Sequence, residues 1–363
     1  MTMWRRRREF LTALFSFWVG VGLSLLGELA VKASQADELQ LVVNPYEGID
    51  WEKVYRVKTG LHAHTTESDG SEPPERMIDE YRRLGFQALA LTDHNKCTWP
   101  WEKWGRSAND LGMLAIPGNE LSRHHHTVSL FTTYESELSD LNKNLENINN
   151  LGGLAILAHP GRYWKPTAAG VVPADVLERY KSLFMAHDVL IGIEVINYEN
   201  RYPHDRLLWD ALLEQVMPGR PVWGVANDDA HSRSAVGRNW VVLLMTELSL
   251  SAAKEALRQG RFYFATITTH DRLVRNREQT PEIIAVLHHP QEAVLEIKAV
   301  SGGKPLPEEA CVWISAGKVV HKGMRLHYNR TPGLRSYVRA ELKGQGGTAF
   351  TQPFGFAVKA PNQ

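Results

Sequence analysis

Between residues 57 and 245, short apolar runs alternate with stretches whose apolar positions recur every three or four residues. The apolar runs predict β-strands, and the periodic stretches predict amphipathic helices between them. Strands are expected at Val57–Ala63, Ala88–Thr92, Met113–Gly118, Val128–Phe131, Leu154–Ala158, Ile191–Ile196, Pro221–Val225 and Trp240–Met245. Strands that alternate with helices about seven times favour a parallel sheet closed into an α/β barrel.

The first helix has clear boundaries in the sequence. Ser71 is expected to cap it, Pro73 and Pro74 suit its first turn, and Gly85 ends it. The segments 174–190 and 205–217 show the same apolar periodicity and predict two further helices.

After about residue 275 the pattern changes to alternating strands, such as Val294–Val300, separated by glycine-rich turns. This alternation is typical of an antiparallel sheet with one solvated face. We therefore expect an α/β domain over residues 55–272 and a small antiparallel β domain over residues 275–363.

The first 36 residues have the layout of a signal peptide: four arginines at Arg5–Arg8, the apolar stretch Phe10–Leu26, then small residues. Within it, Arg7–Leu11 (RREFL) resembles the twin-arginine motif, which directs folded proteins out of the cytoplasm. The expected location is periplasmic or extracellular. The alternative is a membrane anchor that stays uncleaved, because an apolar run of about 17 residues is at the lower limit for spanning a bilayer.

Composition narrows the possible partners. The chain holds 41 Lys plus Arg and 41 Asp plus Glu, with no basic stripe after the first ten residues, so no nucleic-acid partner is expected. Cys97 and Cys311 lie far apart without a CxxC pair, so neither a thiolate zinc site nor a disulfide scaffold is indicated. The two thiols are either unpaired and partly buried or joined in one bridge. The sequence does not specify an oligomeric state.

Residue types that bind metals follow almost every expected strand of the α/β region. The carboxyl ends of barrel strands share one face, so these side chains should converge in one basin. The candidate metal ligands are His62, His64, Asp69, His94, Glu120, His126, His159, Asp229 and His231. Taken singly, an HxH pair or an Ala-His-Pro segment is commonly a surface or turn feature. Together at successive strand ends they predict a metal cluster, because uncompensated buried histidines and carboxylates cost free energy.

Five short motifs of this chain resemble, in order, those of the PHP (polymerase and histidinol phosphatase) family. They are Leu61–Gly70 (LHAHTTESDG), Leu91–Asn95 (LTDHN), Gly118–Ser122 (GNELS), Ala158–Pro160 (AHP) and Asn227–Ser232 (NDDAHS). The tail, including Ala253–Phe264 and Thr351–Pro353, resembles larger, carbaryl-hydrolase-like members of the family.

The resemblance implies a distorted seven-stranded (β/α) barrel with two or three divalent ions. Because the candidate ligands are nitrogen and oxygen without thiolate, the candidate metals are Mn, Fe and Zn. It assigns His62, His64, Glu120 and Asp229 to the first ion, Glu120, His126 and His159 to the second, and Asp69, His94 and His231 to the third. His124 and His125 are the alternatives to His126, and Asp69 stands where some members have histidine. Asp228 would bring an additional carboxylate to the rim of the site.

The implied activity is hydrolysis of a small phosphate ester by a hydroxide that the ions share. Arg162 is either a phosphate clamp or an ordinary surface arginine, and Asp229 or His231 would manage protons. Glu194 and Asn197 are expected to shape the floor of the site without binding metal. The alternatives are a carboxyl-ester or carbamate hydrolase with the same cluster, and a noncatalytic metal-dependent binding protein.

Overall fold

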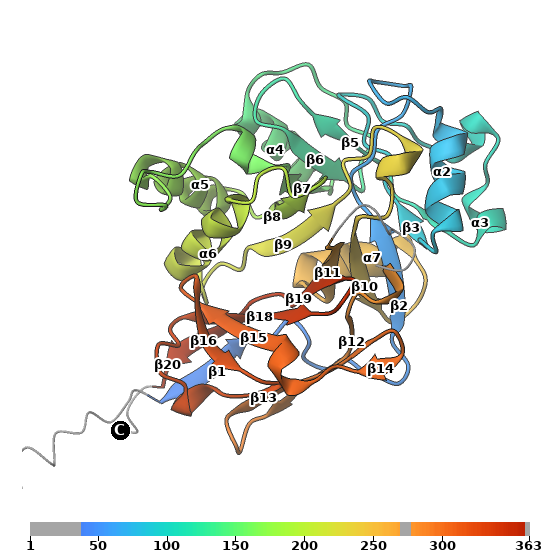
Figure 1. Ribbon diagram of the computed structural model, residues 1–363. Helices are drawn as coiled ribbons and strands as arrows, with labels where there is room; N and C mark the ends of the chain where they lie inside the picture. Colours follow the sequence, from blue (N-terminus) through green and yellow to red (C-terminus); the bar gives the residue numbers. More distant parts are fainter. Residues whose placement is uncertain (1–37, 269–276, 360–363) are drawn as a thin grey trace, which may run out of the picture. The chain divides into compact units, whose positions relative to one another are not determined.

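The computed structural model describes residues 38–268 and 277–359. Within them, Leu39–Ala357 forms one compact unit (Figure 1). The expected signal segment, residues 1–36, lies outside the described residues. Over the described ranges, no helix has both the length and the apolar character that crossing a membrane requires.

The largest sheet of the described residues has 11 strands, and it contains both the start of the α/β region and the C-terminal strands. Its order is β1 (Leu39–Val43), β20 (Phe354–Val358), β18 (Tyr337–Lys343), β19 (Gly347–Phe350), β11 (Phe262–Ile267), β10 (Asn239–Met245), β2 (Tyr55–Gly60), β3 (Ala88–Leu89) and β4 (Leu114–Ala115). β15 (Cys311–Ser315) pairs with β18, and β16 (Lys318–Lys322) pairs with β15.

A second sheet carries the middle of the α/β region. Its order is β5 (Gly118–Leu121), β6 (Thr127–Leu130), β7 (Leu154–Leu157), β8 (Leu190–Asn197) and β9 (Trp223–Asn227). The third sheet contains β12 (Glu282–His289), β13 (Val294–Ser301), β14 (Lys304–Pro305) and β17 (Arg325–His327). Two isolated bridges, Ala63 to Ala230 and His94 to Glu120, join the ends of the first two sheets.

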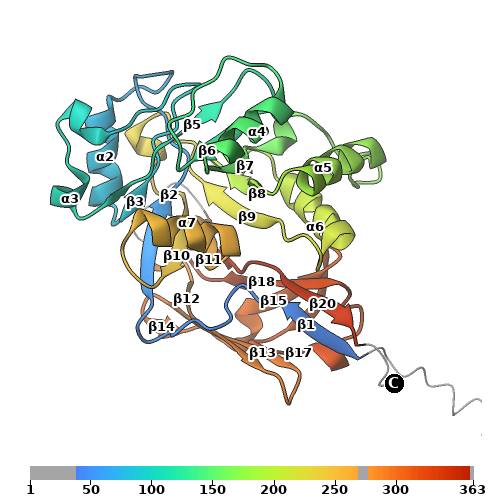
Figure 2. The same cartoon turned by 180° about the vertical axis from the view of Figure 1, so that it is seen from behind.

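Helices flank these sheets. α4 (Leu141–Asn150) contacts β7, and both α5 (Ala174–Ala186) and α6 (Asp205–Val216) contact β8 (Figure 1). Seen from behind, α7 (Leu250–Gln259) lies against β10 (Figure 2). α2 (Pro74–Arg83) and α3 (Ala108–Leu111) follow β2 and precede β4. The helices expected at 174–190 and 205–217 are confirmed as α5 and α6.

Two expectations about local structure need correction. Ser71 does not cap α2: the N-cap is Pro73, and the Ser71 hydroxyl donates to the carbonyl of His231. The strand expected over Met113–Gly118 is two strands, β4 and β5, separated by Ile116 and Pro117. Proline has no backbone N–H to donate to a ladder, which suits this break.

The expected parallel sheet is only partly correct. β7, β8 and β9 are parallel, but β6 is antiparallel to both β5 and β7, and β10 is antiparallel to β2. The paired strands of residues 38–268 and 277–359 form separate sheets and no closed barrel, so the seven-stranded barrel stays a prediction.

The C-terminal strands pack into the same unit as the α/β strands. β19 pairs with β11, and the Gln352 side chain exchanges two hydrogen bonds with the backbone of Gly224 in β9, at 2.9 and 2.8 Å. Buried Arg339 of β18 binds Asp210 of α6 through two contacts of 2.7 Å. The boundary expected near residues 272–275 therefore does not coincide with a break in this sheet. Cys97 and Cys311 are both buried free thiols.

Candidate metal centre

The ends of several strands bring the predicted metal ligands together. His62 and His64 follow β2, His159 follows β7, and Asp229 follows β9, while Glu120 lies within β5. The bridges from Ala63 to Ala230 and from His94 to Glu120 fix the two sheets to each other within this group.

Two of these residues have a backbone conformation that non-glycine residues rarely adopt. His159 has φ 29° and Asp229 has φ 46°. Left-handed backbone at side chains with chemical function is a form of strain that surrounding structure must maintain. Each of these residues lies two positions after the end of a strand, where the chain turns out of the sheet.

The first group of ligand atoms has the spacing that one cation requires. Nε2 of His62 and Nε2 of His64 are 3.1 Å apart, and each lies 3.1–3.5 Å from Oε2 of Glu120 and from Oδ1 of Asp229. Atoms bound tetrahedrally at 2.0–2.1 Å from one ion are about 3.4 Å apart. These four residues therefore fit a single divalent ion.

Glu120 faces two groups at once. While Oε2 lies beside His62 and His64, Oε1 lies 2.9 Å from Nδ1 of His126 and 3.1 Å from Nε2 of His159. The carboxylate is 1% exposed. Its two oxygens thus face two separate groups of candidate ligand atoms.

A third group surrounds Asp69 at the more open side of the site. Its Oδ1 lies 3.3 Å from Nε2 of His231 and 3.6 Å from Nδ1 of His64, and its Oδ2 lies 3.4 Å from Nε2 of His94. The Asp69 side chain is 52% exposed and that of His231 is 41% exposed. Any ion held here would be the one most accessible to solvent.

Polar residues behind the ligands fix their orientation. Glu194 accepts a hydrogen bond from Nδ1 of His62 at 2.7 Å and from the backbone N–H of His159 at 2.9 Å. Asn197 donates to Glu194 at 2.9 Å and to Oδ2 of Asp229 at 3.2 Å. Glu194 and Asn197 thus lie directly behind the ligands, where the sequence interpretation expected them.

Further supporting contacts were not anticipated from the sequence. Asp93 accepts hydrogen bonds from the backbone N–H of Thr65 and the hydroxyl of Ser68, both at 2.7 Å, and so orders the loop that carries Asp69. The hydroxyl of Tyr163 accepts from the backbone N–H of His126 at 3.0 Å. The Asp93–His94 pair was visible in the sequence, but no local signal indicated a role for Tyr163.

The electrostatics of the site favour cations. Burial alone would raise the pKa of Glu120, but neighbouring histidines, chiefly His62, outweigh burial and hold this pKa well below its usual value. Burial alone would also raise the pKa of Asp229, but His62 and His64 outweigh burial and lower this pKa. Both carboxylates are therefore anionic at neutral pH, in the form that binds metal.

The imidazoles also fit metal binding. Nδ1 of His231 donates to the carbonyl of Asp229 at 2.9 Å, which leaves Nε2 as a lone-pair donor. Nδ1 of His64 is buried without a hydrogen-bond partner among the described residues, and the buried Nδ1 of His94 lies 3.0 Å from Oε2 of Glu120 without forming a hydrogen bond to it. Buried nitrogens are rarely left unsatisfied, so these atoms are consistent with coordination.

His124, His125 and Asp228 lie outside the groups of candidate ligand atoms. Nε2 of His125 contacts the hydroxyl of Tyr180 at 2.8 Å, and Nε2 of His124 accepts from Asn144 at 2.7 Å, so both histidines face away from Glu120. Asp228 does not reach the rim: it is 3% exposed and accepts hydrogen bonds from three backbone N–H groups, those of residues 237–239. The expectation of an additional carboxylate at the rim is thus wrong.

Arg162 ends a short 3₁₀ turn, Pro160–Arg162, that directly follows His159, and its side chain is exposed. Within the described part of the chain, its guanidinium makes no hydrogen bond or ion pair. Its role as a phosphate clamp stays a prediction.

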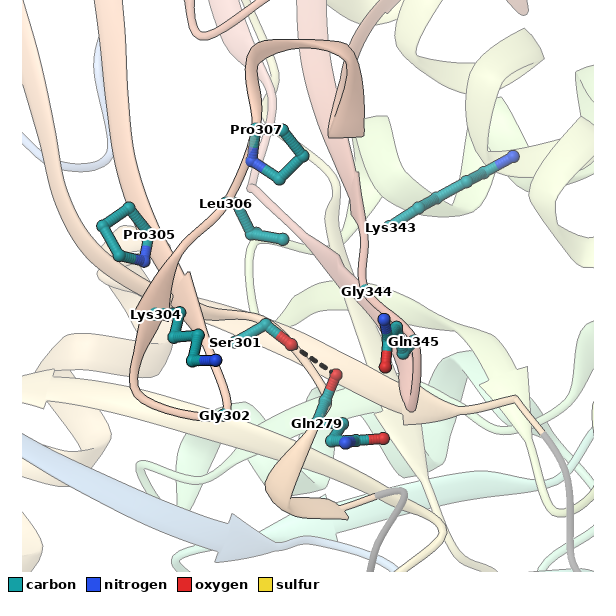
Figure 3. Close-up of a pocket in the computed structure, with 10 residues that line it drawn as sticks. All are labelled: Gln279, Ser301, Gly302, Lys304, Pro305, Leu306, Pro307, Lys343, Gly344 and Gln345. Atoms are coloured by element: carbon teal, nitrogen blue, oxygen red, sulfur yellow. Dashed lines mark hydrogen bonds between the residues drawn. The ribbon is translucent and has the colours of Figure 1, made fainter.

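A cavity of about 540 Å³ lies in the C-terminal region, lined by Gln279, Lys304, Lys343 and their neighbours (Figure 3). Ser301, also in its lining, donates to the carbonyl of Gln279 at 2.6 Å. None of the residues that line it is a candidate metal ligand.

Comparison with known proteins agrees with the motif order. The PHP domain model matches residues 60–216, a range that includes every candidate ligand except Asp229 and His231. An error-prone DNA polymerase of Nocardia farcinica is 39% identical over 64 residues, which are 17% of this chain and 6% of that polymerase. The chain therefore spans only a small part of such relatives.

Two solved structures are similar at low identity. One is a two-domain protein of Bacteroides vulgatus containing a predicted PHP-like metal-dependent phosphoesterase, with 18% identity, 90% of this chain and 95% of that chain covered, and a TM-score of 0.47. The other is a lesion-specific endonuclease of Pyrococcus furiosus, with 16% identity, 56% of each chain covered and a TM-score of 0.38. The family match over residues 60–216, together with the ordered motifs, supports membership of the PHP superfamily.

Proposed function

We propose that this chain is a metal-dependent hydrolase, a phosphoesterase that cleaves a small phosphate ester. The observation that carries the proposal is Glu120, whose two oxygens face two separate groups of ligand atoms 2.9–3.5 Å away. A shared carboxylate between two cation positions is the arrangement of two-metal hydrolytic sites. The proposed ions are Mn, Fe or Zn, because the ligand set is nitrogen and oxygen without thiolate.

Such ions, when bound, lower the pKa of a water and neutralise charge on a phosphoryl group. The residues of the chain hold and orient them. His62, His64, Glu120 and Asp229 are the proposed ligands of the first ion, Glu120, His126 and His159 those of the second, and Asp69, His94 and His231 those of the third. Glu194 fixes the tautomer of His62, since it accepts the Nδ1 hydrogen and leaves Nε2 available.

The remaining roles concern the substrate and protons. Arg162 would bind the nonbridging phosphate oxygens through its planar fork. Asp229 and His231 are the candidates for proton transfer, because the His231 side chain is 41% exposed and its Nδ1 is tied to the backbone of Asp229.

The test is hydrolysis by the manganese-loaded full chain. We expect turnover of p-nitrophenyl phosphate and a loss of roughly 100-fold or more in a Glu120→Gln variant, which keeps the side-chain shape but removes the bridging charge. Glu146→Gln, on the exposed face of α4, is the matched control and should retain wild-type turnover.

Three parallel substrates separate the alternatives. Turnover of p-nitrophenyl acetate without the phosphate would assign the chain to carboxyl-ester or carbamate hydrolysis. Cleavage of a single-stranded oligonucleotide without p-nitrophenyl phosphate would contradict a small-molecule substrate. Failure to hydrolyse any ester of a broad panel, with metal bound, would indicate a binding protein.

A further inference from the structure

A second cavity, of about 230 Å³, lies at the edge of the sheets that carries the metal ligands. Its lining includes Tyr198, Glu199, Asn200, Arg206, Arg238 and Thr266. These residues come from the loop after β8, the start of α6, the residue before β10 and the end of β11. Among the described residues of the lining, the charged side chains are two arginines and one glutamate.

Arg238 is the most buried charged group of this cavity. It is 8% exposed, and its Nη1 forms an ion pair with Glu199 while its Nη2 donates to the carbonyl of Ser234 at 3.4 Å. Its Nε is buried and has no hydrogen-bond partner among the described residues. An arginine presents its Nε and Nη hydrogens as a fork that matches an oxyanion, and one prong of this fork is unused.

Arg206 is also incompletely paired. Among the described residues, its ion-pair partner is Oε2 of Glu341, at 3.7 Å, and the other oxygen of Glu341 is bound by Arg339 at 2.7 Å. Its guanidinium lies 5.0 Å from the ring centre of Phe350. Within residues 38–268 and 277–359, Arg206 therefore makes one long ion pair and a ring contact, and no bidentate contact with a carboxylate.

The cavity is connected to the metal centre through the chain. Asn197, which precedes Tyr198, donates to Oδ2 of the candidate ligand Asp229 at 3.2 Å. The backbone N–H of Arg238 donates to Asp228, the residue before Asp229, at 2.9 Å. Tyr198 adopts a left-handed φ of 51°, a strained conformation of the kind found at functional loops.

We propose that this cavity is a subsite for an oxyanion, either carboxylate or phosphate, that forms the second anionic group of the substrate, bound by Arg238 and Arg206. The inference rests on the proposed function, because the subsite would determine which phosphate esters the metal centre hydrolyses. It assigns the substrate to the class of phosphate esters that carry another anionic group.

The first experiment compares substrates that differ in one charge. O-phosphorylated hydroxy acids of two, four and six carbons are assayed beside their methyl esters with the metal-loaded full chain. We expect kcat/KM for at least one acid to exceed that for its ester roughly tenfold, and this ratio to fall toward one in Arg206→Gln and Arg238→Gln. Arg238→Lys keeps the charge without the Nε hydrogen and should give an intermediate ratio. Arg201→Gln, in the same loop but exposed and outside the lining, should keep the wild-type ratio.

The second experiment needs no turnover. Inorganic phosphate is titrated calorimetrically into the metal-free full chain, and we expect one site that Arg238→Gln weakens roughly tenfold, with Arg201→Gln unchanged. Equal phosphate binding in all variants would mean an adventitious ion only and would overturn the inference. So would an acid preference that survives in both Arg206→Gln and Arg238→Gln.

The two experiments also separate the subsite from the proposed function. Phosphate binding that depends on Arg238, without hydrolysis of any ester, would refute the proposed function and retain the subsite. Hydrolysis without any preference for the acids would retain the proposed function and refute the assignment of the cavity to a second anionic group of the substrate. If phosphate binding still depended on Arg238 in that case, the cavity would be a site for a free oxyanion.

Discussion

Replacing Glu194 by Gln should weaken metal binding at the His62 position without unfolding the protein. Glu194 is fully buried, and each of its oxygens accepts two hydrogen bonds. Oε1 accepts from His62 at 2.7 Å and Asn227 at 2.8 Å, and Oε2 accepts from the His159 backbone and Asn197, both at 2.9 Å.

A glutamine amide has the same shape but replaces one of these acceptors with a donor. If the NH₂ group faces His62, the imidazole must move its hydrogen from Nδ1 to Nε2, the atom that points to Glu120 and Asp229. Loss of such a partner behind a metal-binding histidine costs about 10–100-fold in affinity, or about 1.4–2.7 kcal/mol.

The assay is competition for Mn²⁺ or Zn²⁺ against a fluorescent chelator, with thermal unfolding of the metal-free protein as the measure of fold stability. Glu178→Gln, on the exposed surface of α5, is the control because it makes the same chemical change away from the site. Unchanged affinity in a folded Glu194→Gln variant would refute the orienting role that the hydrogen bonds suggest.

Three further outcomes are expected. Asp69→Ala should remove about one equivalent of metal as measured by elemental analysis, since its carboxylate joins only the third group; loss of all ions or of none would contradict this assignment. Arg339→Met should lower the free energy of unfolding by about 3–5 kcal/mol in urea titrations, because it leaves buried Asp210 without its partner; a change below 1 kcal/mol, roughly the value of a surface ion pair, would be the contrary result. Burial raises the pKa of Asp205 to about 8, so the folded state keeps a proton that the unfolded state releases above about 3.9. Stability should therefore fall as pH rises between these values, by about 1.4 kcal/mol per pH unit from this group, and Asp205→Asn should remove that component of the slope; identical slopes in urea titrations at pH 5, 6 and 7 would count against it.

Much of the candidate site could be read from the sequence, because each ligand follows or lies within a strand whose residue composition is distinctive. Glu120 shows the limit of that reading. The motif GNELS identified the residue, but only the structure shows that its two oxygens face different histidines. Side-chain direction depends on contacts with distant segments, which local patterns do not encode.

The direction of the strands likewise could not be predicted from the sequence. Val128–Phe131 is apolar like its neighbours, and a fully buried strand has the same composition whether its partners are parallel or antiparallel. The short turn from β5 into β6 leaves no room for a crossover helix, which is why this pair is antiparallel. The position of Asp228 was predicted wrongly for a related reason: the backbone N–H groups of residues 237–239, which donate to its carboxylate, come close only after the chain folds back.

The two hydrogen bonds between Gln352 and Gly224 have a consequence for how such chains can diversify. In the five-stranded sheet β9 is a terminal strand, and the Gln352 amide meets backbone groups there that another strand would otherwise pair. Asp229 follows that same strand by two residues. Recombination that exchanged the C-terminal segment alone would therefore alter the support of a candidate ligand, so the α/β region and its tail are expected to be inherited together.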